Sequence, residues 1–371
     1  MTHFGLSSAL AETEEFDPNT KDGAASILQI ESVTITGTRI SSDQSPISGL
    51  TTVITREMIE ARADENIIDL LRGESGVHVA QSGGRGGVAS VQLRGGDPNF
   101  TLVLVDGIKV NDPTNARGGS FDFSALPLAQ VERMEITRGA QSSVYGSDSL
   151  GGVISITTRD SAAPGGMLDI VLGESGFRRT SISVSSSVTD ISQLSVTVSS
   201  EDDGDILVGN EFANDSLTGN YSLNDGDALS ISLRGLLSSS ESRAFPDDSG
   251  GPRLSVLRAL GDREKDQLAV SASARYQYTD QLELNLLLGT NKHDEISSSP
   301  AVALGVRDGV PASNIDSEFR RENMAIHGAL NWSENTQAIL GIDYLREDGE
   351  LAGQIELFPG FSLPQDFALD R

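Results

Sequence analysis

The stretch Leu268-Ala269-Val270-Ser271-Ala272-Ser273-Ala274-Arg275-Tyr276-Gln277-Tyr278 alternates between two kinds of side chain. Its even-numbered positions are large or apolar, and its odd-numbered positions are small or polar. Successive side chains of a β-strand point to opposite faces, so this period of two predicts a strand with one apolar and one polar face. The same alternation recurs in residues 194–199, 229–234, 282–288, 324–332 and 338–344. From residue 167 onward, the sequence therefore predicts a long antiparallel sheet.

The connections between these strands favour a membrane barrel over a soluble sandwich. Those at 187–190, 224–226, 279–280 and 333–335 are short, and those at 200–214, 237–266 and 291–318 are long. Short and long connections alternate, apart from a short first one near 174–176, as they do when turns and loops lie on opposite sides of a bilayer. Aromatic side chains also lie near strand ends, where a barrel carries its interfacial girdle: Tyr276, Tyr278, Trp332 and Tyr344.

We therefore predict the N-terminal part of an antiparallel transmembrane β-barrel over residues 165–371. About nine strands are visible, and an open edge of such a sheet is costly in lipid because its backbone groups lack partners. The sequence ends at Asp370-Arg371, inside what we expect to be an outer loop. We therefore expect the chain to be a fragment of a larger protein.

Composition excludes several classes of function. The 371 residues carry a formal net charge of −27, which argues against a nucleic-acid partner, and the absence of cysteine removes disulfides and thiolate chemistry. No apolar run is long enough for a spanning helix. The four histidines, His3, His78, His293 and His327, lack metal-ligand spacing, and no catalytic triad or nucleophile motif is visible. An enzyme is therefore the least favoured class.

The N-terminal residues are typical of an exported protein. Leu6-Ser7-Ser8-Ala9-Leu10-Ala11 ends in a small-x-small pattern that indicates the remnant of a signal peptide over residues 1–11, although a disordered tail remains an alternative. Residues 12–45 are predicted to be a polar arm. Residues 46–160 mix strands, helices and glycine turns, and they predict an α+β domain. Its second helix is expected over 64–72, with Asp64 as N-cap and Gly73 as stop.

Five segments within residues 31–154 resemble TonB-dependent outer-membrane receptors, most closely the branch that takes up cobalamin and its siderophore-receptor relatives. In order they are Glu31–Gly37, Thr52–Thr55 with Ile67–Leu71, Gln92–Gly95 with Val103–Gly107, Val131–Ile136 with Arg138-Gly139, and Val144–Ile154. The resemblance implies that residues 46–160 form a plug inside a barrel of about 22 strands.

The resemblance implies a TonB box at Val33, Thr34, Ile35, Thr36 and Gly37. Its β-branched residues favour an extended backbone, which could add as a strand to the periplasmic partner TonB. An ordinary first plug strand is the alternative.

Two further sets of plug residues are assigned from the family. The resemblance implies that Arg94 and Arg138 lock the plug onto glutamates of the barrel wall, with ordinary surface ion pairs as the alternative. It also implies two apical loops that face the ligand, although any of their residues could equally serve as a connector. Their candidate ligand-binding residues are Gln81, Ser82, Arg85, Asn111, Asp112, Asn115, Arg117 and Ser120.

An acidic cluster in a predicted outer loop, Asp202, Asp203, Asp205 and Asp215, offers the oxygen ligands that Ca²⁺ prefers. A solvated loop is the alternative. No cofactor is required by any motif.

The leading hypothesis is TonB-dependent active uptake of a large scarce nutrient, a cobalamin or a ferric siderophore, by a protein embedded in outer-membrane lipid. Two other classes stay open: a passive porin with an N-terminal extension, and an extracellular adhesin or carbohydrate-binding β-protein.

Overall fold

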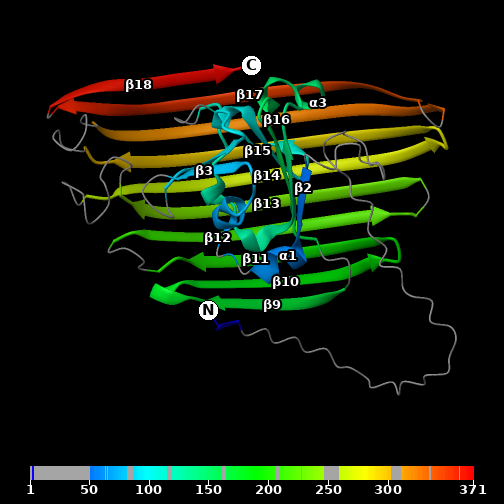
Figure 1. The fold of residues 1–371 in the computed structure, drawn as a ribbon, viewed down its shortest axis with the longest axis horizontal. Helices are drawn as coiled ribbons and strands as arrows, with labels where there is room; N and C mark the ends of the chain where they lie inside the picture. Colours follow the sequence, from blue (N-terminus) through cyan, green and yellow to red (C-terminus); the bar gives the residue numbers. More distant parts are fainter. Residues whose placement is uncertain are drawn as a thin grey trace.

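The computed structural model describes residues 2–3 and 51–371, apart from 63, 65, 82–86, 115–118, 161–163, 205–208, 227, 246–258, 302–310, 334–335 and 359. It has two parts. Residues 51–160 form a small α+β unit, called the plug below, and residues 165–371 form a large antiparallel sheet, called the wall. The plug lies against one face of the wall (Figure 1). In the part of the chain that is described, no helix is long and apolar enough to cross a membrane.

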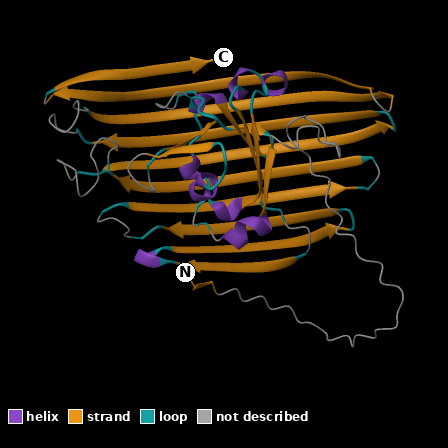
Figure 2. Ribbon diagram, in the orientation of Figure 1, coloured by secondary structure: helices purple, strands orange, loops and turns teal. Residues whose placement is uncertain are grey.

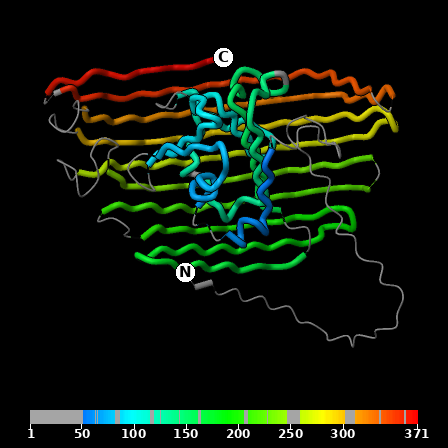
Figure 3. Tube along the Cα trace, in the orientation of Figure 1, coloured from blue at the N-terminus to red at the C-terminus, as the bar shows by residue number. Residues whose placement is uncertain are grey.

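The wall consists of consecutive antiparallel strands in chain order, from β9 at one edge to β18 at the other (Figure 3). The short strand β1 (Thr2–His3) pairs with β9, and the 3-10 turn η6 (Glu174–Gly176) follows β9. The strands are β9 (Gly165–Leu172), β10 (Arg178–Thr189), β11 (Ser192–Asp202), β12 (Glu211–Asn224), β13 (Leu229–Ala244), β14 (Gly261–Thr279), β15 (Leu282–Ser299), β16 (Ala312–Ser333), β17 (Thr336–Phe358) and β18 (Phe361–Asp370).

Three expectations about the wall were wrong. Residues 361–370 do not lie in an outer loop, because they form β18 and pair with β17. The short connection between β17 and β18 also breaks the predicted alternation. The long connections are shorter than expected, since β13 and β14 continue pairing as far as Ala244 and Gly261. Charged residues occupy both faces there, for example Glu264 on the outward face and Lys265 on the plug-facing side of β14, so the period of two fades while the backbone pairing persists.

The predicted assignment of the two faces of the wall is confirmed. One face is apolar and exposed over much of its height, with side chains that include Leu194, Val198, Leu233, Leu237, Ile326 and Leu340. The opposite face carries small and polar side chains buried beneath the plug, including Ser195, Thr197, Thr218, Asn220, Ser271 and Asn291. Such a distribution suits a sheet with lipid on one side and a polar lumen on the other.

The plug contains a mixed sheet, a hairpin and short helices (Figure 2). The sheet order is β2-β7-β8-β5-β6, in which β5 and β8 run parallel, and β3 pairs with β4. The strands are β2 (Thr51–Thr55), β3 (Val77–Gln81), β4 (Ala89–Leu93), β5 (Thr101–Val105), β6 (Ile108–Lys109), β7 (Val131–Arg138) and β8 (Gly152–Thr158). The helices are α1 (Arg56–Arg62), α2 (Ile67–Arg72), η2 (Pro98–Phe100), η3 (Phe123–Ala125), η4 (Leu128–Gln130), α3 (Ser142–Tyr145) and η5 (Ser147–Ser149).

Helix α2 begins later than predicted. Its N-cap is Asn66, whose side chain accepts a hydrogen bond from the backbone N–H of Asp69 at 2.9 Å. Asp64 was expected to serve as the cap, but its carboxylate pairs with Arg62 instead. Gly73 is the C-cap, as predicted. The helix buries Leu70 and Leu71 in the plug core, so its position is fixed by packing as well as by its caps.

The wall completes the plug core. Leu236 of β13 and Ala269 of β14 belong to the same buried cluster as plug residues such as Ile54, Phe123 and Ile136. Two small or branched wall side chains therefore supply apolar surface that the plug cannot provide for itself. The two parts pack as one body along this line.

Candidate functional site

The hairpin between β5 and β6 carries the first polar contact between plug and wall. Asp106 and Gly107 form its turn with positive φ values of 50° and 84°, which glycine adopts readily and aspartate tolerates. The Asp106 carboxylate accepts hydrogen bonds from the backbone N–H and the hydroxyl of Thr158, at 2.9 and 2.8 Å. Arg234 of β13 approaches the same carboxylate at 3.3 Å and reaches Asp160 at 3.4 Å. Burial raises the pKa of Asp106, although the charge of Arg234 opposes this shift.

A buried ionic cluster joins η3 to strands β14 and β15. Asp122 accepts hydrogen bonds from the N–H groups of Ala89 and Ser124, at 2.9 and 3.0 Å. Its other oxygen lies 2.5 Å from the Arg263 guanidinium and 3.9 Å from Lys265. Glu295 of β15 pairs with the same two cations, at 2.7 and 3.7 Å. Burial acts to raise the pKa of Asp122, but the charges of Arg263 and Lys265 outweigh it and hold this pKa well below its usual range.

A third contact lies between the loop after β6 and strands β15 and β16. Asp112 accepts a hydrogen bond from the N–H of Thr114 at 2.8 Å, and its second oxygen lies 2.9 Å from Nε2 of His293. The His293 ring packs against Phe319, with ring centroids 5.4 Å apart. Burial acts to raise the pKa of Asp112, but its hydrogen bond with His293 leads the interactions that lower it overall.

Arg321 of β16 holds the plug backbone beside this contact. Its guanidinium donates to the carbonyl oxygens of Lys109 and Asn111, at 3.1 and 2.6 Å, and also bonds to Glu347 of β17. The guanidinium lies over the Phe319 ring, 5.1 Å from its centroid, so a cation–π contact adds to the hydrogen bonds. Glu347 is buried and bonded on its other side to Arg371.

Neutral side chains make the contact with β11 and β12. Gln130 is fully buried, donates to the Ser216 hydroxyl at 2.9 Å and accepts from the Thr218 hydroxyl at 2.6 Å. Asn220 donates to the carbonyl oxygen of Arg159. The printed ion pairs between plug and wall thus involve β13 to β15, whereas Arg321 of β16 bonds to plug carbonyl oxygens and the contacts of β11 and β12 are neutral.

The ionic contacts have the opposite polarity to the predicted lock. Plug aspartates pair with wall cations, whereas plug arginines were expected to pair with wall glutamates. Arg138 bonds within the plug, to the carbonyl oxygen of Ser75 and the hydroxyl of Thr52, both at 2.7 Å, with Glu74 at 3.9 Å. Arg94 is exposed and lies beside Gly139, close enough for its charge to act on Arg138. The structure therefore brings both arginines together, and their pairing with barrel glutamates stays a prediction.

The described residues of the predicted apical loops are largely engaged within the protein. Asn111 is buried, accepts from the N–H of Val103 at 2.7 Å and donates to the carbonyl oxygen of Thr101 at 3.0 Å. Ser120 is buried, and Gln81 accepts from Arg72 at 2.6 Å. Ser82, Arg85, Asn115 and Arg117 lie outside the described residues. A ligand-binding role for these loops stays a prediction.

Two other predicted sites are described in part or not at all. Asp202 pairs with Arg178 at 2.8 Å, Asp203 is buried, and Asp215 is exposed on the outward face of β12. Asp205 and the five TonB-box residues Val33 to Gly37 lie outside the described part of the chain. Among the described residues, no group of three or more histidine or acidic side chains is arranged to hold a metal ion. The calcium site and the TonB box stay predictions.

Sequence reasoning missed the wall cations Arg263, Lys265, His293 and Arg321. The signal that could have found Arg263 and Lys265 is parity, because both occupy odd-numbered positions of β14, on the face predicted to be polar. They were assigned instead to the loop 237–266. A cation on the lumen side of a strand needs an anionic partner when another part of the protein buries it. The plug buries Arg263 and Lys265 and supplies the carboxylate of Asp122.

The stabilisation from Asp122 is expected to disappear in acid. Because the pKa of Asp122 lies below its ordinary value of about 3.9 in the fold, its contribution is present above about pH 4 and is lost as the pH falls through the depressed value. Asp122→Asn should therefore lower the free energy of unfolding at pH 7, with a gap to the parent chain that narrows below about pH 4. Urea unfolding of the purified protein in detergent, at pH 7 and below pH 4, measures the loss of stability and its dependence on pH. Asp148→Asn, at a half-exposed pair with Lys109, is the control and should show neither effect.

Comparison with known proteins identifies the relatives of this chain. Residues 43–153 match the family model described as TonB-dependent Receptor Plug Domain. Over 174 residues the chain is 36% identical to the vitamin B12 transporter BtuB of Vibrio cholerae serotype O1, an alignment that covers 47% of this chain and 28% of that protein.

Two solved structures share the fold of both parts. The unliganded ferric citrate transporter FecA superposes with a TM-score of 0.68 at 15% identity, covering 86% of this chain and 50% of that one. FpvA of Pseudomonas aeruginosa, bound to a heterologous pyoverdine, gives 0.69 at 17% identity, covering 86% and 45%. The chain thus spans half or less of the length of these relatives. At such identities the structural likeness establishes the fold alone. The similarity in sequence comes from the 174 residues that align with BtuB.

Proposed function

This chain belongs to the TonB-dependent receptor family of outer-membrane proteins, and we propose that it serves the energy-dependent uptake of a large nutrient across that membrane. The observation that carries the proposal is the seating of the plug. It lies on the polar face of the wall, while the opposite face is apolar and exposed, as lipid contact requires.

A seated plug supports active transport over passive flow. The Asp106, Asp112 and Asp122 carboxylates each meet a cation or histidine of the wall, and Leu236 and Ala269 extend the plug core into it. Contacts of this kind hold a domain in place, so solute passage needs work to move or partly unfold it. A passive porin would have no use for such anchoring.

The work would come through the N-terminal arm. Residues 33–37 are proposed to pair as an added strand with TonB, and β2, which begins at Thr51, is the first plug strand after the arm. Among the strands that the structure describes, β2 lies at the edge of the plug sheet and pairs with β7 alone. A pull on the arm would therefore peel an edge strand first, which breaks backbone hydrogen bonds one at a time.

The proposed ligand is a cobalamin or a ferric siderophore. Similarity to a protein named as a vitamin B12 transporter favours the first, while the solved relatives are named for ferric citrate and pyoverdine. The plug loops 81–87 and 111–120 are proposed to contact the ligand from the outer side, with calcium ordering the loop around Asp202 and Asp203.

Deletion of residues 33–37 separates binding from transport. The test uses cells in which the gene that encodes this chain is the only receptor gene of its kind. These cells receive either radiolabelled cyanocobalamin or a catecholate siderophore loaded with radioactive iron. We expect the deletion to leave surface binding intact and to reduce accumulation to the level of cells without the gene. Deletion of five residues elsewhere in the arm, 20–24, should leave accumulation unchanged. Accumulation that survives loss of residues 33–37 would indicate a passive pore, and absence of both binding and accumulation for either probe would favour an adhesin.

A further inference from the structure

The plug carboxylates that meet the wall differ in the kind of cation beside them. Asp106 and Asp122 meet arginines of the wall, at 3.3 and 2.5 Å, and arginine keeps its charge at any pH that a cell encounters. Asp112 instead lies 2.9 Å from Nε2 of His293. Histidine is the side chain that ordinarily changes its charge between about pH 5 and 8. The cation at Asp112 can therefore lose its charge in a range where the other two stay charged.

Residues 112–114 lie in a notch of the wall that His293 helps to form. His293 and Gly349 belong to the same register row of the wall, on β15 and β17. The methyl group of Thr114 packs where Gly349 has no side chain, 2.7 Å from the position that a Cβ would take. The backbone N–H and the hydroxyl of Thr114 donate to one oxygen of Asp112, at 2.8 and 2.6 Å. The second oxygen is the one that meets His293, so this contact ties a short turn of the plug to the notch.

The residue just before this turn is held by contacts that do not depend on pH. The Asn111 side chain bonds to backbone groups of Val103 and Thr101, at 2.7 and 3.0 Å. Its backbone carbonyl oxygen accepts a hydrogen bond from Arg321 at 2.6 Å. Amide and guanidinium groups keep their protonation state between about pH 5 and 8. Asn111 is therefore a fixed point, and a change of charge at His293 acts on the residues that follow it.

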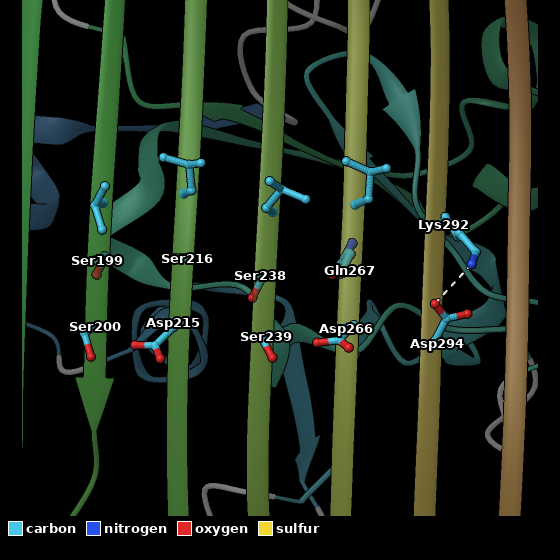
Figure 4. A pocket seen from close by; sticks show the side chains of 14 residues that line it. Ser199, Ser200, Asp215, Ser216, Ser238, Ser239, Asp266, Gln267, Lys292 and Asp294 are labelled. Atoms are coloured by element: carbon cyan, nitrogen blue, oxygen red, sulfur yellow. Dashed lines mark hydrogen bonds and ion pairs between the residues drawn. The ribbon is translucent and has the colours of Figure 1, made fainter.

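The surroundings of His293 leave the imidazole ring as the group that changes charge. Among the described residues, the charged side chains that flank it on the plug-facing side of the wall already have partners of opposite charge: Lys265, Glu295 and Arg321. Its neighbours in sequence, Lys292 and Asp294, lie on the outward face and pair with each other at 3.2 Å (Figure 4). Burial raises the pKa of Asp106, so the contact at the hairpin turn weakens in acid, which is a change of opposite sign.

We propose that the contact between Asp112 and His293 is a pH-sensitive latch, which holds residues 112–114 in the notch while the ring is charged and loosens when the ring loses its proton. Burial acts to raise the pKa of Asp112, but its hydrogen bond with His293 leads the interactions that lower it overall, so the carboxylate stays ionised above about pH 5. The neutral ring can still donate a hydrogen bond, but the attraction between opposite charges is lost and a buried carboxylate remains. The latch is therefore closed in mild acid and loosened in mild alkali.

Hydrogen exchange of the purified protein in detergent tests the latch without any ligand, so the result does not depend on the proposed function. Protection factors, corrected for the intrinsic effect of pH on exchange, are compared at about pH 5.5 and about pH 8. We expect protection of the Asp112 and Thr114 amides to fall about tenfold at the higher pH, a factor that corresponds to about 1.4 kcal/mol. Protection of β8, the central strand of the plug sheet, should stay nearly constant. His293→Gln can donate a hydrogen bond but never carries a charge, so it should show the lower protection at both pH values.

His327→Gln is the matched control, because His327 also lies on the plug-facing side of the wall but pairs with Asp343 of β17. It should keep the pH dependence of the parent chain. Asp112→Asn preserves the turn with Thr114 and removes the charge from the other partner, so it should abolish the pH dependence even if His293→Gln does not fold. Equal protection at both pH values in the parent chain would overturn the proposal, as would a pH dependence that survives in either latch variant. A loss that β8 shares with the turn would show loosening of the whole plug and would overturn it as well.

Discussion

The variant Arg263→Met is expected to lower the free energy of unfolding by about 3–5 kcal/mol, because it leaves buried carboxylates without their main counter-charge. Arg263 is the only residue within 3 Å of both Asp122 and Glu295 among the ion pairs of the described residues. Lys265 stands farther from each, at 3.9 and 3.7 Å. Methionine keeps much of the length and apolar bulk of the arginine stem, so the change removes charge more than volume.

Arg243→Met is the matched control. Arg243 lies on the adjacent strand β13 and also meets two carboxylates, Asp262 at 2.7 Å and Glu211 at 3.6 Å, but it is exposed. Solvent screens such pairs, so this variant should unfold almost as the parent chain does. Urea unfolding in detergent and the rate of proteolytic cleavage within the plug measure both variants. Equal stability of the two would show that burial of the Asp122 cluster contributes nothing.

A second substitution distinguishes two causes of the destabilisation: the loss of the attraction between Arg263 and its carboxylates, and the cost of leaving a buried carboxylate unpaired. If the cost of Arg263→Met arises from an unpaired buried carboxylate, then adding Asp122→Asn should recover part of the loss. Simple additivity of the two single effects would contradict this explanation. Recovery would also mean that the cluster specifies where the plug sits more than it stabilises the fold.

How far the sequence predicts this architecture depends on the range of the interactions involved. The faces of β14 follow from the period of two in residues 268–278, since alternation is a local consequence of strand geometry. The turn at Asp106-Gly107 is equally local and was found as predicted. Helix α2 was found where it was predicted but begins later, because its N-cap is Asn66 and not Asp64, a polar residue two positions earlier that could serve the same role.

The polarity of the plug contacts could not be predicted in the same way. Asp122 and Arg263 are far apart in sequence, and nothing local shows that η3 lies beneath β14. The family resemblance supplied Arg94 and Arg138, which lie at glycine turns of the plug, close enough for the charge of one to act on the other. Strand length was also missed, since β13 and β14 continue where both faces are charged and only backbone pairing holds them.

The second large effect is expected from Gly289→Ala. Gly289 lies on the plug-facing side of β15, and an added Cβ would fall 2.0 Å from Cγ2 of Ile108 and 2.5 Å from Oδ1 of Asn323. Ile108 is 1% exposed and belongs to the plug core, so it has no free space into which to withdraw. Overpacking of this kind costs about 1–3 kcal/mol. Thermal unfolding in detergent and protease sensitivity of the β5–β6 hairpin should both change.

The same substitution at Gly235 isolates the effect of the contact. Gly235 lies on strand β13, and a Cβ added there would have no atom within 4 Å. Alanine at this position therefore removes only backbone freedom and should be neutral or slightly stabilising, by up to about 1 kcal/mol. Ile108→Ala removes the atom that Gly289→Ala would strike, so the double variant should cost less than the two single losses combined. An additive result would mean that the hairpin does not seat in the hollow at Gly289. Sub-additivity would show that the wall keeps a glycine there because the plug needs the room of one missing methyl group.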